Sequence, residues 1–332
     1  MGDTDIGWTH RPGTRGRSWN PTQGCALKSE GCRNCYAMRM AARFAESGWS
    51  KGLINLKTRK WNGEARLAAH KLDEPLRWRE PSTVFVNSMS DLFYEGFSNE
   101  QIAAVFGVMA ACQQHTFLVL TKRARRMREW FEWIADQLVS AHQLGAARGV
   151  RWHAWTEFGR IGNVTAEEIV SPSYRRGCTP DWRWPLPNVW LGVSVENQDA
   201  ADERIPDLLT TPAAVRFLSC EPLLGRLDFV LRGNRIKEWD EDWKYDTLRG
   251  SEWARPDPDI EDGSSAKLDW LITGCESGPG ARSAEESWFR SISDQCRAAG
   301  VPLFNKQMRI NGRVETDPAR FPSDLQIQEW PQ

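Results

Sequence analysis

Short runs of consecutive apolar residues alternate with amphipathic segments along most of this chain. Six of the apolar runs end in polar residues, and each is expected to form a short buried strand. These runs cover residues 83–86, 116–120, 189–195, 215–219, 268–273 and 301–304. An extended lead-in before residue 23 brings the expected total to about seven strands.

Helical periodicity follows most of these strands. Ser98 and Gln101 match a capping box, which predicts a helix through Ala111. Further helices are expected over residues 34–47, 127–138, 200–209 and 288–299, with a short one near 65–72. Strands alternating with helices indicate an α/β fold built on a parallel sheet. A partial, open barrel fits this count better than a complete eight-unit barrel.

Two segments interrupt the alternation. Residues 140–187 end in a stretch rich in tryptophan and proline, and we interpret them as a lid or substrate element. Residues 231–267 are charged and are expected to form a solvated loop. We therefore expect a single domain over residues 1–332 with two insertions.

The composition describes an ordinary soluble chain. Its 332 residues carry a formal net charge of −1, with 40% hydrophobic and 26% charged residues. No apolar run approaches the roughly twenty residues of a membrane span, and the N-terminal segment is too polar for a signal peptide. We expect a cytoplasmic protein, in the host cytoplasm if the gene is phage-encoded, with no membrane partner. Eight unevenly spaced cysteines favour thiol or metal chemistry over disulfides.

Eighteen tryptophans stand against four tyrosines, and several lie near basic clusters. Aromatic rings interleaved with arginine can stack bases and neutralise phosphates, as at Trp61, Trp78, Trp130 and Trp182. Core packing with solvated arginine neighbours is the alternative, and burial trends favour it.

The strongest chemical signal is a loop with three cysteines. Cys25, Cys32 and Cys35 have the spacing C-x6-C-x2-C and lead directly into the first expected helix. Soft thiolates suit iron-sulfur clusters and zinc. Three ligands leave one iron of a [4Fe-4S] cluster open, where S-adenosylmethionine could bind. A structural zinc completed by His10 or another histidine, and incidental reduced cysteines, remain alternatives.

Polar residues gather directly after the expected strands. Ligands of parallel sheets bind at the carboxyl ends of the strands, so this recurrence predicts a site there. Glu221 and Glu276 are candidates to accept a substrate or cofactor hydroxyl. Cys220 and Cys275 precede them, and a thiol there could return a hydrogen atom to a product radical, although a buried thiol that only fills space is the alternative.

Several strings resemble a phage-borne three-cysteine-motif family. They cover residues 18–21, 24–37, 85–93, 120–123, 190–197, 221–225 and 276–282. That family is similar to an outlying branch of the radical S-adenosylmethionine superfamily, nearest to the spore photoproduct lyase group. The resemblance implies a partial (β/α)6 barrel with a [4Fe-4S] cluster on Cys25, Cys32 and Cys35.

The resemblance also implies how S-adenosylmethionine is held. Asn87, Ser88 and Asp91 would stand where the superfamily binds the methionine amino group. Ser194, Glu196 and Asn197 would lie in the region that binds the ribose and carboxylate. The superfamily spacing is C-x3-C-x2-C with an aromatic residue before the last cysteine, whereas this chain has six intervening residues and Asn34 at that position.

Purely structural roles are the alternatives for several of these residues. Asp91 and Glu196 could be helix caps. Lys122 with Arg123 could bind the S-adenosylmethionine carboxylate or a substrate phosphate, or could form a solvated basic turn.

The resulting hypothesis is a radical S-adenosylmethionine enzyme, of isomerase or lyase type, that abstracts hydrogen from its substrate. The phage association points to a nucleobase in DNA, such as a modified thymidine in a hypermodification pathway, presented out of the duplex. A flavodoxin or ferredoxin would supply the electron. A pyrimidine-lesion repair lyase and a zinc-bound nucleic-acid-binding module without catalysis are the rivals.

Overall fold

The computed structural model describes residues 3–140, 184–233, 244–253 and 266–332. Within these ranges the chain divides into two compact units. Unit 1 comprises residues 1–28, 35–191 and 211–214, and unit 2 comprises residues 29–34, 192–210 and 215–332. The three-cysteine loop is therefore divided between them, with Cys25 and Cys35 in unit 1 and Cys32 in unit 2.

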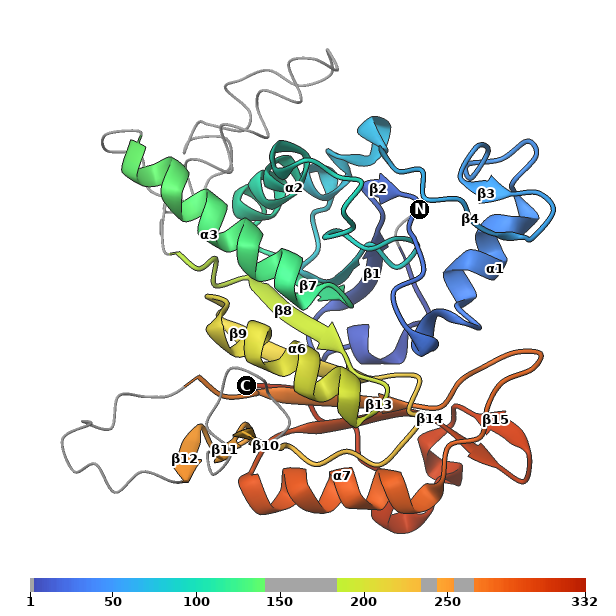
Figure 1. Cartoon of the computed structure of the whole chain (residues 1–332), viewed down its shortest axis with the longest axis vertical. Coiled ribbons are helices and arrows are strands. Elements are labelled where there is room, and N and C mark those ends of the chain that lie inside the picture. Colours follow the sequence, from blue (N-terminus) through green and yellow to red (C-terminus); the bar gives the residue numbers. More distant parts are fainter. Residues whose placement is uncertain (1–2, 141–183, 234–243, 254–265) are drawn as a thin grey trace. The chain divides into compact units, whose positions relative to one another are not determined.

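Unit 1 is built on parallel strands with helices between them (Figure 1). Its strands are β1 (Arg15–Trp19), β2 (Thr22–Gln23), β3 (Ile54–Asn55), β4 (Lys60–Trp61), β5 (Arg66–Leu67), β6 (Ser82–Val86) and β7 (Thr116–Thr121), followed by the beginning of β8 (Val189–Ser194). The sheet order is β1-β6-β7-β8, and β1 pairs with β6 and β6 with β7 in parallel. Its helices are α1 (Tyr36–Arg43), α2 (Asn99–Ala111) and α3 (Ala124–Ser140).

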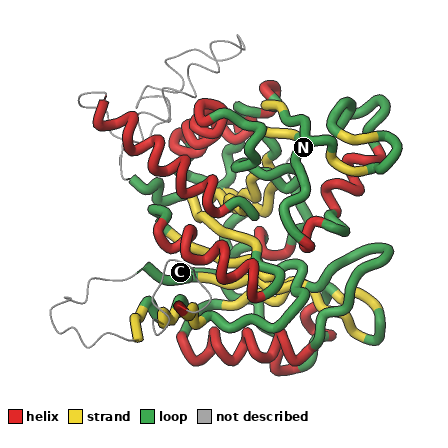
Figure 2. The backbone as a smooth tube through the Cα atoms, viewed as in Figure 1, coloured by secondary structure: helices red, strands yellow, loops and turns green. Residues whose placement is uncertain are grey.

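Unit 2 continues from the end of β8 with the order β8-β9-β13-β14-β15. Its elements are α6 (Gln198–Thr210), β9 (Val215–Cys220), β10 (Val230–Arg232), β11 (Lys244–Asp246), β12 (Ser251–Trp253), β13 (Trp270–Gly274), α7 (Glu286–Ala299), β14 (Leu303–Ile310) and β15 (Arg313–Glu315). Strand β13 pairs in parallel with β9 and β14, whereas β15 is antiparallel to β14. Figure 2 shows the alternation of helices and strands in each unit.

The predicted α/β class and the expected strands are confirmed. Each of the six apolar runs is a strand, and the lead-in is β1. The capping box of α2 is present, since Gln101 N donates to Ser98 Oγ at 3.3 Å and Ser98 N to Gln101 Oε1 at 3.0 Å. The barrel of the radical S-adenosylmethionine type stays a prediction.

Some local expectations differ from the structure. Near residues 65–72 the chain forms β5 and a short 3-10 helix (Ala69–Lys71) instead of an α-helix. Within the charged segment 231–267, β11 and β12 form an antiparallel sheet with β10, where we expected a loop. Most of the first insertion lies outside the described residues, as do parts of the second.

Aromatic side chains fill the interior of each unit. In unit 1, Trp130 stacks on Phe106 with ring centroids 4.4 Å apart, and both are buried. In unit 2, Trp270 packs against Phe217. Of the four tryptophans near basic clusters, Trp130 is core, Trp61 is partly buried against Ala41 and Ile54, and Trp78 lies under the guanidinium of Arg17. Trp182 is outside the described residues.

No helix in the described ranges combines the length and apolar character that crossing a bilayer requires.

Candidate functional site

Gly24, which belongs to unit 1, leads from β2 into the three-cysteine loop. Its φ is +97°, and a Cβ placed there would lie 2.1 Å from the carbonyl oxygen of Glu64. Real Cβ atoms do not approach this closely, so only glycine fits. The entry to Cys25 is therefore fixed by the backbone.

Arg123 holds the Cys25 end of the loop. The guanidinium donates from Nη2 to the carbonyl oxygen of Ala26 at 3.0 Å, and its Nη1 lies 3.9 Å from Cys25 Sγ. Asp91 and Glu95 balance its charge, with Nη1 to Asp91 Oδ2 at 3.0 Å and Nε to Glu95 Oε2 at 2.7 Å. A buried cation thus lies at the sulfur, so the interpretation of a solvated turn is wrong for Arg123, which is 5% exposed.

Asp91 serves to position this arginine. Its carboxylate also accepts hydrogen bonds from Thr121 Oγ1 at 2.7 Å, Phe93 N at 3.0 Å and Lys122 N at 3.2 Å. Burial acts against the charge of Arg123, but Asp91, Cys25 and Glu95 together raise its pKa above the ordinary value. The guanidinium therefore stays protonated.

Asn87, the residue directly after β6, has a left-handed backbone conformation with a φ of +60°. Its backbone N donates to Trp19 O at 2.7 Å, and its Oδ1 accepts from Thr22 N at 3.4 Å. Within the described ranges, its buried Nδ2 has no hydrogen-bond partner. Next to it, Ser88 Oγ donates to Asn20 Oδ1 at 3.2 Å. A buried donor that lacks a partner is costly, so Asn87 offers an amide to a ligand at this strand end.

In unit 2, Glu196 holds the loop beside Cys32. Gly31 N donates to Glu196 Oε1 at 3.4 Å, and a Cβ on Gly31 would lie 3.0 Å from Glu196 Cδ. Arg204 Nη1 pairs with Glu196 Oε2 at 2.9 Å and donates to Ser194 O at 2.7 Å. The side chains of Glu196 and Arg204 are 1% and 2% exposed. The buried ion pair with Arg204 therefore fixes Glu196, and Glu196 in turn accepts the hydrogen bond from the loop at Gly31.

A second anchor in unit 2 engages Asn34. Its Nδ2 donates to Glu276 Oε2 at 2.9 Å and to Gly280 O at 3.0 Å. Arg282 joins Glu276 to the loop, with Nη2 2.7 Å from Glu276 Oε1 and 2.8 Å from Glu30 O. Burial alone would raise the pKa of Glu276, but hydrogen bonds from Arg282 and Asn34 lower it to about 2. Glu276 is thus an ionised acceptor.

The other predicted catalytic residues lie at the ends of β9 and β13. Glu221 Oε1 pairs with Lys306 Nζ at 2.5 Å, and both side chains are partly exposed. Cys220 and Cys275 are each 0% exposed. Burial raises the pKa of Cys220 well above its usual value and that of Cys275 to about 11, so both hold their proton at neutral pH.

The predicted ribose region divides into different roles. Asn197 Oδ1 accepts from Ala200 N at 3.0 Å and so caps α6, a role that we considered for Glu196. The sequence pattern did not reveal Arg204 as the partner of Glu196 or Lys306 as the partner of Glu221. An arginine eight residues after a carboxylate in one strand-helix unit was the available signal for Arg204.

The three cysteines of the loop carry partly exposed thiols. Among the described residues, no three or more His, Cys, Asp or Glu side chains are grouped in a metal-binding arrangement. The donor set itself fits an iron-sulfur cluster in its chemistry, since the sulfurs are soft and a buried guanidinium offsets negative charge at Cys25. Iron ligation by Cys25, Cys32 and Cys35 stays a prediction.

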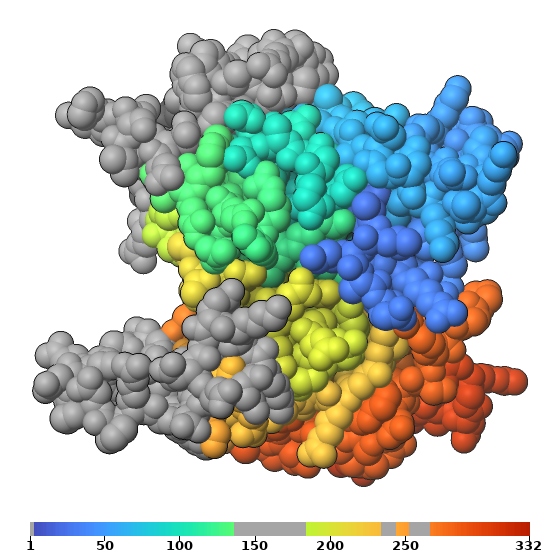
Figure 3. All heavy atoms as spheres, viewed as in Figure 1, coloured from blue at the N-terminus to red at the C-terminus, as the bar shows by residue number. Residues whose placement is uncertain are grey.

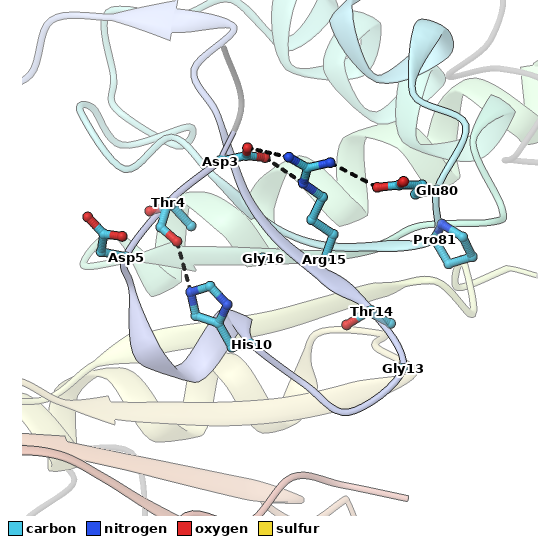
Figure 4. Close-up of a pocket in the computed structure, with 10 residues that line it drawn as sticks. All are labelled: Asp3, Thr4, Asp5, His10, Gly13, Thr14, Arg15, Gly16, Glu80 and Pro81. Atoms are coloured by element: carbon cyan, nitrogen blue, oxygen red, sulfur yellow. Dashed lines mark hydrogen bonds and ion pairs between the residues drawn. The ribbon is translucent and has the colours of Figure 1, made fainter. Parts of the chain in front are cut away.

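An open hollow of about 750 Å³ lies at the amino ends of β1 and β6 (Figure 4). Arg15 closes it with ion pairs to Asp3 at 2.5 Å and Glu80 at 2.9 Å, while His10 Nε2 bonds Thr4 O at 2.8 Å. Three of its charged groups, Asp3, Arg15 and Glu80, are thus paired with one another. Ligands of parallel sheets bind at the opposite strand ends, where Asn87 and Asp91 lie, so we do not assign the site to this hollow.

The fold and these residues define an α/β protein of parallel strands with a three-thiol loop, whose Cys25 end is held by the buried Arg123 and whose Cys32 end is held by Glu196, Glu276 and Arg282. The chain belongs to the family described as Protein of unknown function (DUF5131), whose model matches residues 3–326. No curated protein and no solved structure matches the chain.

Proposed function

We propose that this protein is a radical S-adenosylmethionine enzyme with a partial (β/α)6 barrel. Cys25, Cys32 and Cys35 would bind a [4Fe-4S] cluster. The observation that carries the proposal is the loop itself, with three partly exposed thiols and the guanidinium of Arg123 3.9 Å from one sulfur. A buried cation at this position favours a cluster of thiolates, which is anionic.

When bound, the cluster and S-adenosylmethionine together supply a 5′-deoxyadenosyl radical that abstracts hydrogen. The chain contributes binding groups at the strand ends. The resemblance implied that Asn87 and Ser88 bind the methionine amino group. Because the buried Nδ2 of Asn87 is a donor, it suits the methionine carboxylate instead, with Ser88 beside it and Lys122 after β7. Asp91 acts through Arg123 and the Lys122 backbone rather than on the cofactor. Ser194 and Asn197 keep the predicted role near the ribose.

Cys220, Cys275, Glu221 and Glu276 differ in what they can do. Burial raises the pKa of both Cys220 and Cys275, so both thiols keep their hydrogen at neutral pH, and we propose that one of them returns it to a product radical. Glu221 forms an ion pair with Lys306, and its partly exposed side chain is accessible to a substrate. Glu276 and Glu196 position the loop.

The proposed substrate is a nucleobase in DNA, such as a modified thymidine that undergoes rearrangement. This assignment rests on the resemblance of the motifs to a phage-borne family. The nucleosides of phage DNA with and without this gene, compared by mass spectrometry, test it. Identical nucleoside profiles would exclude DNA hypermodification, and an activity restricted to damaged pyrimidines would favour the repair lyase.

Anaerobic purification followed by iron, sulfide and zinc analysis tests the chemistry. We expect about four iron atoms and four sulfides per chain, and 5′-deoxyadenosine when dithionite and S-adenosylmethionine are added. Cys35→Ala removes a ligand and should abolish both signals. Cys112→Ala alters a buried thiol of α2's C-terminal end and is the matched control, which should keep them. A colourless protein with one zinc per chain would identify a zinc module instead.

A further inference from the structure

Large hydrophobic side chains are exposed in one stretch of the described chain only. Within the described ranges, the exposed ones are Leu27, Tyr36, Met40, Phe44 and Leu56, all of which belong to unit 1. Exposed apolar residues scattered over a surface need no explanation, but exposed apolar residues that all lie within 30 consecutive positions indicate an interaction surface. The stretch begins in the three-cysteine loop and continues through α1.

Tyr36 and Met40 of α1 form a stripe with Phe44, the C-cap residue of the helix. Their spacing of four places them on one side of the helix, and they are 47%, 39% and 44% exposed, although the Tyr36 hydroxyl donates to Ser88 O. Their exposure shows that this is not the core face of the helix. The buried face of α1 is made of small residues such as Ala41 and Ala42, which pack with Ile54.

The helix and the hairpin that follows it are joined firmly. Ser50 Oγ donates to Ala41 O at 2.6 Å, and Arg59 Nη2 donates to Ala42 O. This segment, blue in Figure 3, lies at the surface in that view. The stripe is therefore held on a rigid element and is not a frayed end of the chain.

The same segment is strongly basic. Residues 35–61 contain six Lys or Arg residues and one Glu, whereas the whole chain has a net charge of −1. Arg43, Lys57 and Lys60 are exposed. Aromatic residues, methionine and arginine are the types enriched in protein interfaces. Arg43, which directly precedes Phe44, gives the apolar stripe a basic rim that complements a partner with an acidic surface.

We propose that the α1 stripe, Tyr36, Met40 and Phe44 with Arg43, docks a small acidic one-electron donor protein of the flavodoxin type. This inference rests on the proposed function, because Cys35, a proposed iron ligand, is the N-cap residue of α1. An electron delivered at this helix has a short path to the loop. The stripe is small, which suits the weak and transient contact of an electron-transfer complex. An aliphatic thioether between the two rings favours a protein partner over stacked bases.

Two variants test the surface without touching the loop. Met40→Ser with Phe44→Ser removes the apolar stripe, and Arg43→Glu reverses the rim charge. Arg125→Glu, an exposed reversal on α3, is the matched control. With reduced flavodoxin as donor, we expect each stripe variant to form 5′-deoxyadenosine at least about tenfold more slowly, and Arg43→Glu to flatten the salt dependence. With dithionite as donor, rates should stay within about twofold of wild type, because a small reductant needs no docking.

Binding of labelled flavodoxin by fluorescence anisotropy separates the two proposals. Iron-loaded protein that cleaves S-adenosylmethionine with dithionite, but whose stripe variants bind flavodoxin as wild type does, overturns the docking surface and leaves the proposed function standing. Protein without iron overturns the proposed function, whatever flavodoxin does. Loss of single-stranded oligonucleotide binding, or of a dimer, in the stripe variants with unchanged flavodoxin binding would assign the stripe to nucleic acid or to a second copy, and would overturn the inference.

Discussion

The two ends of the three-cysteine loop are held by different physical means. At the Cys25 end, in unit 1, a buried guanidinium lies at the sulfur itself, and Asp91 and Glu95 balance it. At the Cys32 end, in unit 2, carboxylates hold the backbone and side chains of neighbouring residues, with Glu196 on Gly31 N and Glu276 on Asn34. The first arrangement, Arg123 with Asp91 and Glu95, acts on charge, and we call it the charge anchor. The second, Glu196 with Arg204 and Glu276 with Arg282 and Asn34, acts on position, and we call it the positional anchor.

Because one anchor acts on charge and the other on position, the two contribute differently to metal loading and to stability. A cation beside a thiolate lowers the cost of gathering negative charge, so under the proposed function Arg123 favours metal loading as well as folding. Glu196 and Glu276 are anionic and paired with Arg204 and Arg282, so they do not favour thiolates and contribute through geometry. Variants of the two anchors should therefore diverge in iron content even where they agree in stability.

The largest effect is expected for Arg204→Ala in the positional anchor. The substitution leaves the carboxylate of Glu196 buried without its cation and should lower the free energy of unfolding by about 4 kcal/mol. Urea denaturation measures the loss. Arg297→Ala, which breaks an exposed pair with Asp294, is the control and should change stability by less than about 0.5 kcal/mol. A loss as small as the control's would show that Glu196 is hydrated in solution.

Arg123→Met in the charge anchor should cost about 3 kcal/mol, less than Arg204→Ala, because Asp91 keeps donors from Thr121, Phe93 and Lys122. After reconstitution, iron per chain should fall further in Arg123→Met than in Arg204→Ala. Arg125→Met, in an exposed pair on α3, is the control. Equal iron contents in the two anchor variants would contradict the division between charge and position.

Acid should weaken the positional anchor selectively. The pKa of Glu276 is about 2 in the folded protein against 4.5 as the ordinary value. Because the folded value is the lower one, the stabilisation is fully present above pH 4.5 and is lost as pH falls toward 2. We expect a loss of about 2 kcal/mol over this window, discounted for the partly exposed Arg282. Urea denaturation at several pH values should show a shallower pH dependence for Glu276→Gln, and an unchanged slope would contradict the assignment.

Asn34→Ala should have the smallest effect, about 1 kcal/mol, since it removes neutral-donor hydrogen bonds while Arg282 still satisfies Glu276. Asn62→Ala removes a comparable but exposed bond to Gly52 O and should cost less. Thermal unfolding compares the two. If Asn34→Ala cost as much as Arg204→Ala, the amide and not the ion pair would be the main positional anchor.

The sequence predicted the strands and the helix starts well, because period and capping are local properties. Ser98 and Gln101 are three residues apart, and the pattern that identifies α2 needs nothing else. The strand ends followed from the same reasoning, so Asn87 and Glu221 lie directly after β6 and β9 as predicted.

Pairings between distant residues could not be predicted in this way. Asn34 and Glu276 are 242 residues apart, and neither periodicity nor composition links them. The face of α1 was also ambiguous, because Tyr36, Met40 and Phe44 have the spacing of a core stripe. Alanine packs closely enough to make the opposite face the buried one, and an apolar count does not reveal that preference.

Gly24 limits how this loop can vary during evolution. A side chain at that position meets the carbonyl of Glu64, and the positive φ disfavours every L-residue, so both steric routes to substitution are closed. Insertions or deletions between Cys25 and Cys32 change the length of the loop after Gly24 and do not alter the contact of Gly24 with Glu64. In a saturation mutagenesis screen, position 24 should therefore accept no replacement, while loop lengths after Cys25 remain open to selection.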